Sequence, residues 1–384
     1  MTVTYSNTPY APIIQVLDAW IIADATRRSD FEAAIRTATS HNIPELQNIH
    51  CLNDYLNFID VNLHWIPTEA VRPKELLSRL LATWFVLDQP LVIQYQSPLH
   101  DLSDDGKEQQ PSRISWLSAW MMRYSDAIGK FMDTPASASA ISTFKSSPSY
   151  HLEEYLEPRG GWKTFNEFFA RHVKPGRRPV ASIGDDSIIT SPADFRFVEM
   201  HSISAESTVE TKGMTWRIAQ MLQSSPYKDR FEGGVWLHGF LDVDDYHRVH
   251  TPVAGRVVEA RVLQGNNYMK VAATVKNENK DKNTLTVVND TGYHFSQTRG
   301  LLILETVAGL LAVLPVGMAT VSSVILTAEV GTQLHKGEEI GYFQFGGSDV
   351  VLIFESRMSV EMTMTQGKHY KMGTEVGRLH SAGY

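Results

Sequence analysis

The chain has 384 residues, a length that suggests two or three domains, or one large domain with an extension, and its 43% hydrophobic and 20% charged residues are typical of a soluble globular protein. Its formal net charge of −8 argues against nucleic acid as a partner and leads us to expect at most a peripheral membrane contact. Cys51 is the single cysteine, so an internal disulfide framework is excluded. The first residues also lack a signal-peptide pattern, and we therefore expect a cytoplasmic protein.

The first third of the chain has the pattern of helices. Residues 29–32 (SDFE) form a predicted capping box at the start of one helix. Leucines at helical spacing predict a second helix over residues 72–87, and residues 113–132 predict a long third one rich in aromatic side chains. Residues 99–112 form a polar loop between these two. We expect a helical N-terminal extension over residues 1–135.

The pattern changes in the second part of the chain. Residues 134–149 are small and polar and mark a domain boundary. Beyond about residue 185, short β-rich runs alternate with glycine, asparagine and aspartate, with one helix candidate at 215–223. The expected fold class is therefore α+β, with a β-rich domain over residues 150–384.

Two segments of this β-rich part, 251–268 and 324–345, repeat a pattern of strand, glycine turn and strand. They resemble the half-motifs of lipoyl/biotinyl-type barrel-sandwich folds. Neither has an acceptor lysine at a turn tip, so we interpret the similarity as architecture and not as a swinging-arm carrier function.

Residues 306–328 carry no charge and are long enough to suggest a membrane span. Pro315 and Gly317 interrupt the stretch, and valine, threonine and serine dominate its second half. We interpret it as two buried β-strands that join near these two residues.

The stretch 341–355 (GYFQFGGSDVVLIFE) places two glycines and a serine between two apolar runs. A hairpin turn is the simplest interpretation, because glycine adopts positive φ without steric cost. The alternative is that the backbone at Gly347 and Ser348 is itself the reacting group.

Further polar residues could supply chemistry to Ser348. Asp194 follows Ser-Pro-Ala, and His247 and His250 lie in the segment DYHRVHTPVAG. A serine nucleophile needs a base, and a histidine base needs a group that fixes its orientation. A metal site at the two histidines is disfavoured because no third ligand lies near them in the sequence. The acidic residues just before them lack the spacing of a calcium loop.

Five segments then occur together in one order, and together they resemble the phosphatidylserine decarboxylase family of pyruvoyl enzymes. The resemblance covers about residues 150–358. The helical extension and the FGGS form are most similar to soluble fungal members, which include decarboxylases of free aromatic amino acids such as tryptophan. The segments are TFNEFFARHVKPGRRPV (164–180), SPAD (191–194), DYHRVHTPVAG (245–255), VLPVGMATVSSVIL (313–326) and HKGEEIGYFQFGGS (335–348).

The resemblance implies a proenzyme that cuts itself between Gly347 and Ser348. Ser348 would attack the carbonyl carbon of Gly347, with His250 as general base and Asp194 orienting it. Elimination and hydrolysis would then release ammonia and leave a pyruvoyl group at position 348. His247 would transfer a proton during decarboxylation or position the substrate.

The implied cofactor is this self-derived pyruvoyl group, with no pyridoxal phosphate and no metal. It would form a Schiff base with the substrate amine and accept electrons while CO₂ leaves. The products of processing would be a β chain, 1–347, and an α chain, 348–384. We expect these processed chains to form a homo-oligomer, a dimer.

Two residues depart from the family pattern. Asp349 replaces the usual threonine after the reacting serine, where a carboxylate would either assist proton transfer or oppose a developing negative charge. Phe195 replaces the glycine that commonly follows SPAD, and it would either line an aromatic pocket or pack in the core.

The expected function is a self-processing decarboxylase of an aromatic, tryptophan-like amino acid. One alternative is phosphatidylserine decarboxylase proper. A second is an uncleaved Ser-His-Asp hydrolase or acyltransferase that uses Ser348 directly, and a third is a non-catalytic scaffold with the same fold.

Overall fold

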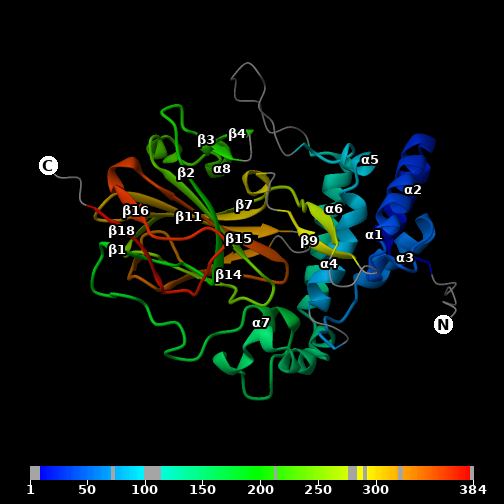
Figure 1. Ribbon diagram of the computed structural model, residues 1–384, viewed down its shortest axis with the longest axis horizontal. Coiled ribbons are helices and arrows are strands. Elements are labelled where there is room, and N and C mark those ends of the chain that lie inside the picture. The colour runs from blue at the N-terminus through cyan, green and yellow to red at the C-terminus, as the bar shows by residue number, and fades with distance from the viewer. Residues whose placement is uncertain are drawn as a thin grey trace.

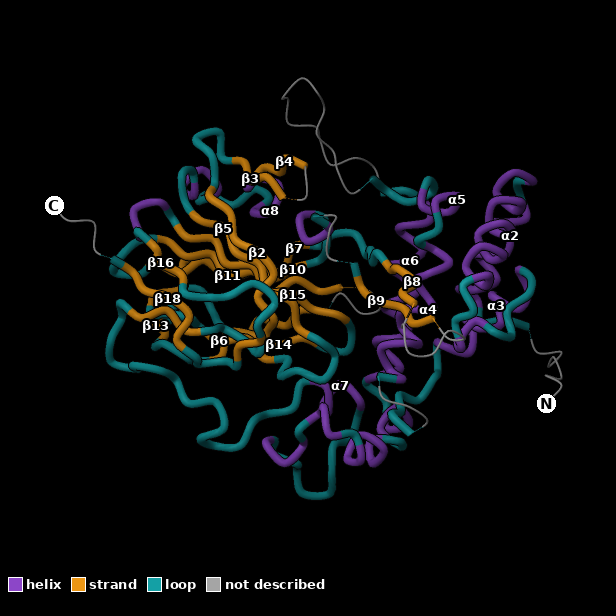
Figure 2. Tube along the Cα trace, viewed as in Figure 1, coloured by secondary structure: helices purple, strands orange, loops and turns teal. Residues whose placement is uncertain are grey.

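The computed structural model describes residues 9–70, 74–98, 114–211, 214–275, 283–288, 292–318 and 323–380. A helical region made from the start of the chain lies beside a β-rich region made from the rest (Figure 1). The tube view separates the two clearly, with most strands gathered on one side and most helices on the other (Figure 2). The predicted α+β class is confirmed.

The helices of the first region bury their apolar stripes against one another. The predicted helices over 72–87 and 113–132 are confirmed as α4 and α6, and Trp84 and Trp120 lie in their core. The predicted polar loop 99–112 lies outside the described residues. The helices are α1 (Pro12–Ile22), α2 (Ala25–Ser40), α3 (Leu52–Asn62), α4 (Glu75–Leu87), α5 (Pro90–Ile93) and α6 (Trp116–Met132).

The capping box predicted at residues 29–32 is wrong. Helix α2 begins one turn earlier, at Ala25, because Asp24 caps it: the Asp24 carboxylate accepts a hydrogen bond from the backbone N–H of Arg27 at 3.0 Å. Ser29 and Glu32 therefore lie inside the helix.

The small, polar segment 134–149 is packed rather than extended. It forms 3₁₀ turns at Pro135–Ala138, Ile141–Ser146 and Pro148–Tyr150, and Phe144 is buried. The Ser137 hydroxyl is also buried and accepts the backbone N–H at the start of helix α7 (Phe165–Phe169) at 2.9 Å. The segment therefore joins the helical region to α7 through internal contacts.

Among the described residues, the largest sheet has the strand order β13-β7-β10-β11-β15-β5-β2-β17, and the pairings within it are antiparallel. Smaller sheets have the orders β12-β14-β6 and β1-β18-β16. The strands are β1 (Ile188–Thr190), β2 (Phe195–Ser202), β3 (Thr208–Thr211), β4 (Met214–Arg217), β5 (Val235–Leu241), β6 (Arg248–His250), β7 (Gly255–Leu263), β8 (Val271–Val275), β9 (Asn283–Val287), β10 (Arg299–Glu305), β11 (Leu310–Met318), β12 (Val324–Leu326), β13 (Gln333–Leu334), β14 (Glu339–Phe343), β15 (Gly347–Phe354), β16 (Val360–Met362), β17 (His369–Tyr370) and β18 (Glu375–Leu379).

The uncharged stretch 306–328 forms two strands, β11 and β12, as predicted, but the predicted join near Pro315 and Gly317 is wrong because both residues lie inside β11. Every residue of β11 is buried, which explains why its sequence lacks the polar alternation of a half-exposed strand. None of the helices in the described part of the chain is long and apolar enough to cross a membrane.

The two segments with the repeated strand pattern lie side by side. β7, from the first, pairs with β13, from the second, through Arg256 with Gln333 and Gly255 with Leu334. The helix predicted at 215–223 is shorter than expected: α8 covers Ile218–Leu222, because the residues before it pair with β3 as strand β4.

A hairpin of the β-rich region reaches the helical region. Strands β8 and β9 pack against α4, as Figure 2 shows. Asp88, just after α4, accepts hydrogen bonds from the Tyr268 hydroxyl at 3.1 Å and from the Val271 backbone N–H at 2.8 Å. The Asn283 side chain donates to the His41 carbonyl at 2.8 Å. These polar contacts fix the helical region against the β-rich region.

Candidate active site

The glycine pair before Ser348 does not form a hairpin turn, the simpler of the two interpretations of this stretch. β14 pairs with β12 and β6, whereas β15 pairs with β11 and β5, so the chain passes from one sheet to another at this point. Gly346 has a φ of 153°, which side chains strongly disfavour. Gly347 is the first residue of β15, so the predicted scissile bond lies at the very start of a central strand.

Ser348 is fully buried between two strands. It is paired with Gly317 of β11 on one side and Leu241 of β5 on the other. Its hydroxyl oxygen lies 3.1 Å from Nδ1 of His247, which is a hydrogen-bond distance. The structure therefore brings two of the predicted site residues into direct contact.

The ring of His247 is enclosed and uncharged. Phe169 of α7 stacks on it at a centroid distance of 3.9 Å. Burial, and to a lesser degree the positive charge of Arg171, lower the pKa of His247 to about 3. Its Nε2 has no hydrogen-bond partner among the described residues. A neutral imidazole with Nδ1 facing a serine can accept the hydroxyl proton, although burial makes the resulting charge costly.

His250 is held by other groups. Its Nδ1 lies 2.8 Å from the carbonyl oxygen of Gly337, and its Nε2 lies 3.0 Å from the hydroxyl of Tyr246. Because a carbonyl only accepts, Nδ1 carries the proton and Nε2 accepts from Tyr246. Burial lowers the pKa of His250, so this neutral form is favoured.

Asp194 lies in a buried ion pair. Its carboxylate receives two hydrogen bonds from Nε of Arg178, at 2.8 and 3.1 Å, and one from Nη2 at 2.6 Å. The backbone N–H of Met372 adds a further bond at 2.8 Å. Within the described residues, no hydrogen bond links Asp194 to His250, so the predicted direct chain from aspartate to histidine to serine is not formed in this conformation.

Arg178 is a site residue that was not predicted from the sequence. It lies in the basic turn KPGRRP, whose composition suggests solvent exposure, yet its side chain is only 2% exposed. It also donates to Glu154 at 2.7 Å. Although burial acts in the opposite direction, hydrogen bonds from Lys371 and Arg178 lower the pKa of Glu154 to about 2. Tyr246, the partner of His250, was also missed, although it directly precedes His247 in the sequence.

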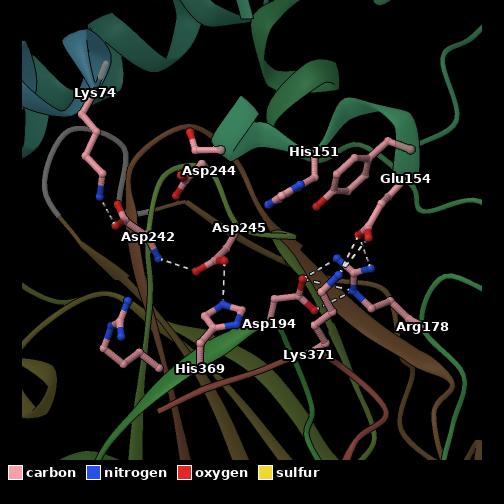
Figure 3. Close-up of a pocket in the computed structure, with 13 residues that line it drawn as sticks. Lys74, His151, Glu154, Arg178, Asp194, Asp242, Asp244, Asp245, His369 and Lys371 are labelled. Carbon is pink, nitrogen blue, oxygen red and sulfur yellow. Dashed lines mark hydrogen bonds and ion pairs between the residues drawn. The ribbon is translucent and has the colours of Figure 1, made fainter. Parts of the chain in front are cut away.

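A polar cavity of about 300 Å³ opens beside Asp194 (Figure 3). Carboxylates and cationic side chains face one another across it, as in the pairs of Lys74 with Asp242 and of His369 with Asp245. Asp242 directly follows Leu241, the β5 residue paired with Ser348, so the cavity lies near the end of the strand that flanks the reacting serine. Its described lining consists of Lys74, Ser149, His151, Glu154, Tyr155, Arg178, Asp194, Arg196, Asp242, Asp244, Asp245, His369 and Lys371.

The two departures from the family pattern have clear structural roles. Phe195 is buried and packs over Gly239, where a Cβ would lie 2.4 Å from the phenylalanine ring. It therefore packs in the core. Asp349 points to the opposite face of β15 from Ser348, because side chains alternate along a strand. Its carboxylate is bound by His238 and Tyr293, away from the reacting hydroxyl.

A comparison with known families matches residues 165–378 to phosphatidylserine decarboxylase. The chain belongs to this family. The match contains all four predicted site residues, and the helices α1 to α6 precede it. The family predicted from the sequence is therefore confirmed.

Individual phosphatidylserine decarboxylase proenzymes are also similar to this chain. Proenzyme 3 of Schizosaccharomyces pombe is 33% identical over 60% of this chain and 23% of its own length. Proenzyme 2 of Oryza sativa subsp. japonica is 31% identical over 60% of this chain and 36% of its own length. The chain thus matches well under half of these two longer relatives. The proenzyme of Ruminiclostridium cellulolyticum is 32% identical over 61% of this chain and 74% of its own length.

Proposed function

We propose that this member of the phosphatidylserine decarboxylase family is a self-processing, pyruvoyl-dependent carboxy-lyase that acts on phosphatidylserine. The observation that carries the proposal is the contact between the buried Ser348 hydroxyl and the neutral His247 imidazole, at the first bond of β15. The three similar proteins are named as proenzymes, which fits a chain that must process itself before it acts.

Self-cleavage proceeds by an acyl shift, an elimination and a hydrolysis. The Ser348 hydroxyl loses its proton and attacks the carbonyl carbon of Gly347; the peptide C–N bond breaks, the freed nitrogen takes up a proton, and an ester joins the two residues. Loss of the Ser348 α-proton then breaks the Cβ–O bond, which leaves Gly347 as a carboxylate and residue 348 as dehydroalanine. Its imine tautomer adds water and releases ammonia, and the pyruvoyl group remains.

His247 is the group placed to accept the Ser348 proton. Its Nδ1 faces the hydroxyl, whereas both nitrogens of His250 are already engaged. The family resemblance assigns the same step to His250, with Asp194 behind it. In the described conformation, His250 would have to give up its bond from Tyr246 before it could take a proton.

The residues around position 348 fit a pyruvoyl group. The precursor serine lies in a dry site and follows a glycine whose carbonyl carries no side-chain obstruction. Once formed, the group supplies an electron-withdrawing carbonyl that reacts with a substrate amine and accepts electrons as CO₂ leaves. His247 lies beside residue 348 in the uncleaved chain and would be the group placed to return a proton at that position.

The proposed substrate is a phospholipid rather than the free aromatic amino acid that the sequence led us to expect. The similar proenzymes are named for phosphatidylserine, and none of these names supports tryptophan. A cavity lined by both signs of charge suits a headgroup that carries an ammonium, a carboxylate and a phosphate.

The alternative of an uncleaved hydrolase is less well supported. Ser348 has no solvent exposure and lies inside a sheet, between β11 and β5. The carbonyl of Gly347, in the same chain and directly adjacent, is therefore a nearer target for the Ser348 hydroxyl than an external ester.

The test combines the mass of the purified protein with release of CO₂. We expect two chains, 1–347 and 348–384, with the second lighter by one ammonia than its encoded mass. We expect CO₂ from phosphatidylserine in mixed micelles and none above background from serine or tryptophan. Ser348→Ala should give a single full-length chain without activity. A wild-type chain that stays intact would contradict the proposed self-processing. Release of CO₂ from tryptophan but not from phosphatidylserine would show that the substrate is an aromatic amino acid.

A further inference from the structure

A buried polar cluster lies directly behind the proposed cleavage site. Ser348 and Asp349 occupy opposite faces of β15, and both have no solvent exposure. The face that carries Asp349 also carries the apolar side chains of Trp236, Val351 and Ile353. A carboxylate in such a place is costly unless other groups compensate its charge.

Two side chains compensate Asp349. Nε2 of His238, on β5, lies 2.9 Å from its Oδ1, and the hydroxyl of Tyr293 donates to its Oδ2 at 3.0 Å. His238 and Tyr293 are themselves buried. We call these three residues the Asp349 clamp.

The clamp is an ion pair with a neutral hydroxyl added. Burial disfavours a charged imidazole, but the neighbouring carboxylate outweighs it and raises the pKa of His238 to about 9. On the other side of the ring, Oε1 of Glu199 lies 3.9 Å from Nδ1. The adjacent His294 is neutral, because burial lowers its pKa well below the usual range.

Self-cleavage removes two of the restraints on residue 348. It breaks the covalent bond to Gly347, and it expels the amide nitrogen through which residue 348 could donate to a neighbouring strand. Asp349 is then the first residue of the new chain that still has its backbone amide, and its side chain is held on two sides. It lies one bond away from the group that must stay aligned during elimination and afterwards.

We propose that Asp349, fixed by His238 and Tyr293, is a positioning residue that holds residue 348 in line for self-cleavage and keeps the processed end of the α chain in place. The inference rests on the proposed self-processing at Ser348. The clamp contacts neither the reacting hydroxyl nor His247, so it acts through the backbone of β15.

A misplaced residue 348 has a chemical signature. If the ester between Gly347 and Ser348 is held in line, elimination leads to a pyruvoyl end. If it is not, water can hydrolyse the ester instead, which leaves Gly347 as a carboxylate and residue 348 as an ordinary N-terminal serine. The ratio of these two ends reports alignment and not overall stability.

The experiment follows processing of the full chain during a pulse and chase in cell-free translation, and then weighs the α chain. In Asp349→Asn and His238→Gln we expect cleavage about tenfold to a hundredfold slower than in the wild type, as for a misalignment on the order of 1 Å. We also expect a new α chain that is heavier than the pyruvoyl form and begins with serine.

Glu259→Gln is the matched control. Glu259 is also a buried carboxylate of the same sheet, bound by Ser225 and Arg261, but it lies on β7, away from β15. The control should lose thermal stability without producing a serine end. Tyr293→Phe removes a single hydroxyl and serves if the charge variants fail to fold.

The proposal is overturned if Asp349→Asn and Tyr293→Phe cleave at the wild-type rate and yield only pyruvoyl ends. A wild-type chain that stays intact would instead remove the proposed function on which the clamp rests. The two failures are therefore distinguishable in the same experiment.

Discussion

Three side-chain contacts make up the candidate active site at the scale of single residues. Ser348 contacts His247, while Asp194 is bound by Arg178 and His250 is bound by Tyr246. Both histidines come from one short segment, yet their surroundings differ. Proton exchange with residue 348 is therefore open to His247 at once and to His250 only after its hydrogen bonds rearrange.

Replacing the two histidines separately should distinguish their roles. We expect His247→Ala to slow self-cleavage by about 10² or more, because it removes the acceptor at hydrogen-bond distance from Ser348. His250→Ala should slow it less, because its nitrogens bind Gly337 and Tyr246. The measurement is the fraction of processed chain over time in a denaturing gel. If His250→Ala instead cleaves more slowly than His247→Ala, then His250 is the general base, and its hydrogen bonds must rearrange in the proenzyme before cleavage.

Gly346 offers a test of backbone conformation. Its φ of 153° is strained for any side chain, so Gly346→Ala should cost about 1–3 kcal/mol and slow cleavage of the adjoining bond. Gly184→Ala is the control, since Gly184 is exposed, has no positive φ and would place its Cβ in open space. Thermal unfolding and a processing gel measure both effects. Equal behaviour of the two variants would contradict the role of Gly346.

At the scale of elements, the sequence predicted the strands better than their partners. Alternating and continuous apolar runs identify β5, β7, β10 and β11, because burial determines composition locally. The hairpin that is the simplest interpretation of residues 341–355 is not formed, because the partners of β15 come from distant segments. Ser348 was found by its motif, but the engagement of Asp194 by Arg178 depends on tertiary contacts that no local pattern specifies.

The contact between α4 and the β8–β9 hairpin can be tested through Asp88. Asp88→Asn keeps the shape but removes a charge that accepts two hydrogen bonds, so we expect a loss of about 1–3 kcal/mol. Limited proteolysis of the helical region and thermal unfolding would measure this loss of stability. Glu305→Gln is the control, because its pair with Arg256 is about half exposed and should contribute little. Equal losses in the two variants would remove Asp88 as a specific link.

At the scale of the whole molecule, stability should depend on pH through the Asp349 clamp. The pKa of His238 is raised to about 9, so its stabilising contribution is complete below its ordinary pKa of about 6.5 and is lost as the pH rises through about 9. We expect the double variant Ser348→Ala/His238→Gln to be less stable than Ser348→Ala at the low end of this pH interval. The difference in unfolding free energy between the two variants should shrink as the pH rises. Urea titrations at several pH values measure it, and a constant difference would mean that His238 does not become charged.

The short α chain expected from cleavage before Ser348 would be threaded through the fold rather than attached to its edge. Its first strand, β15, lies between β11 and β5, β17 pairs with β2, and β18 pairs with β1. Once the chain is cut, the protein can unfold only into two separate molecules, so renaturation becomes a bimolecular encounter that dilution slows. The precursor should regain its shape from denaturant at any concentration. The mature form should recover poorly, and its persistence in the cell would then depend on how slowly it opens.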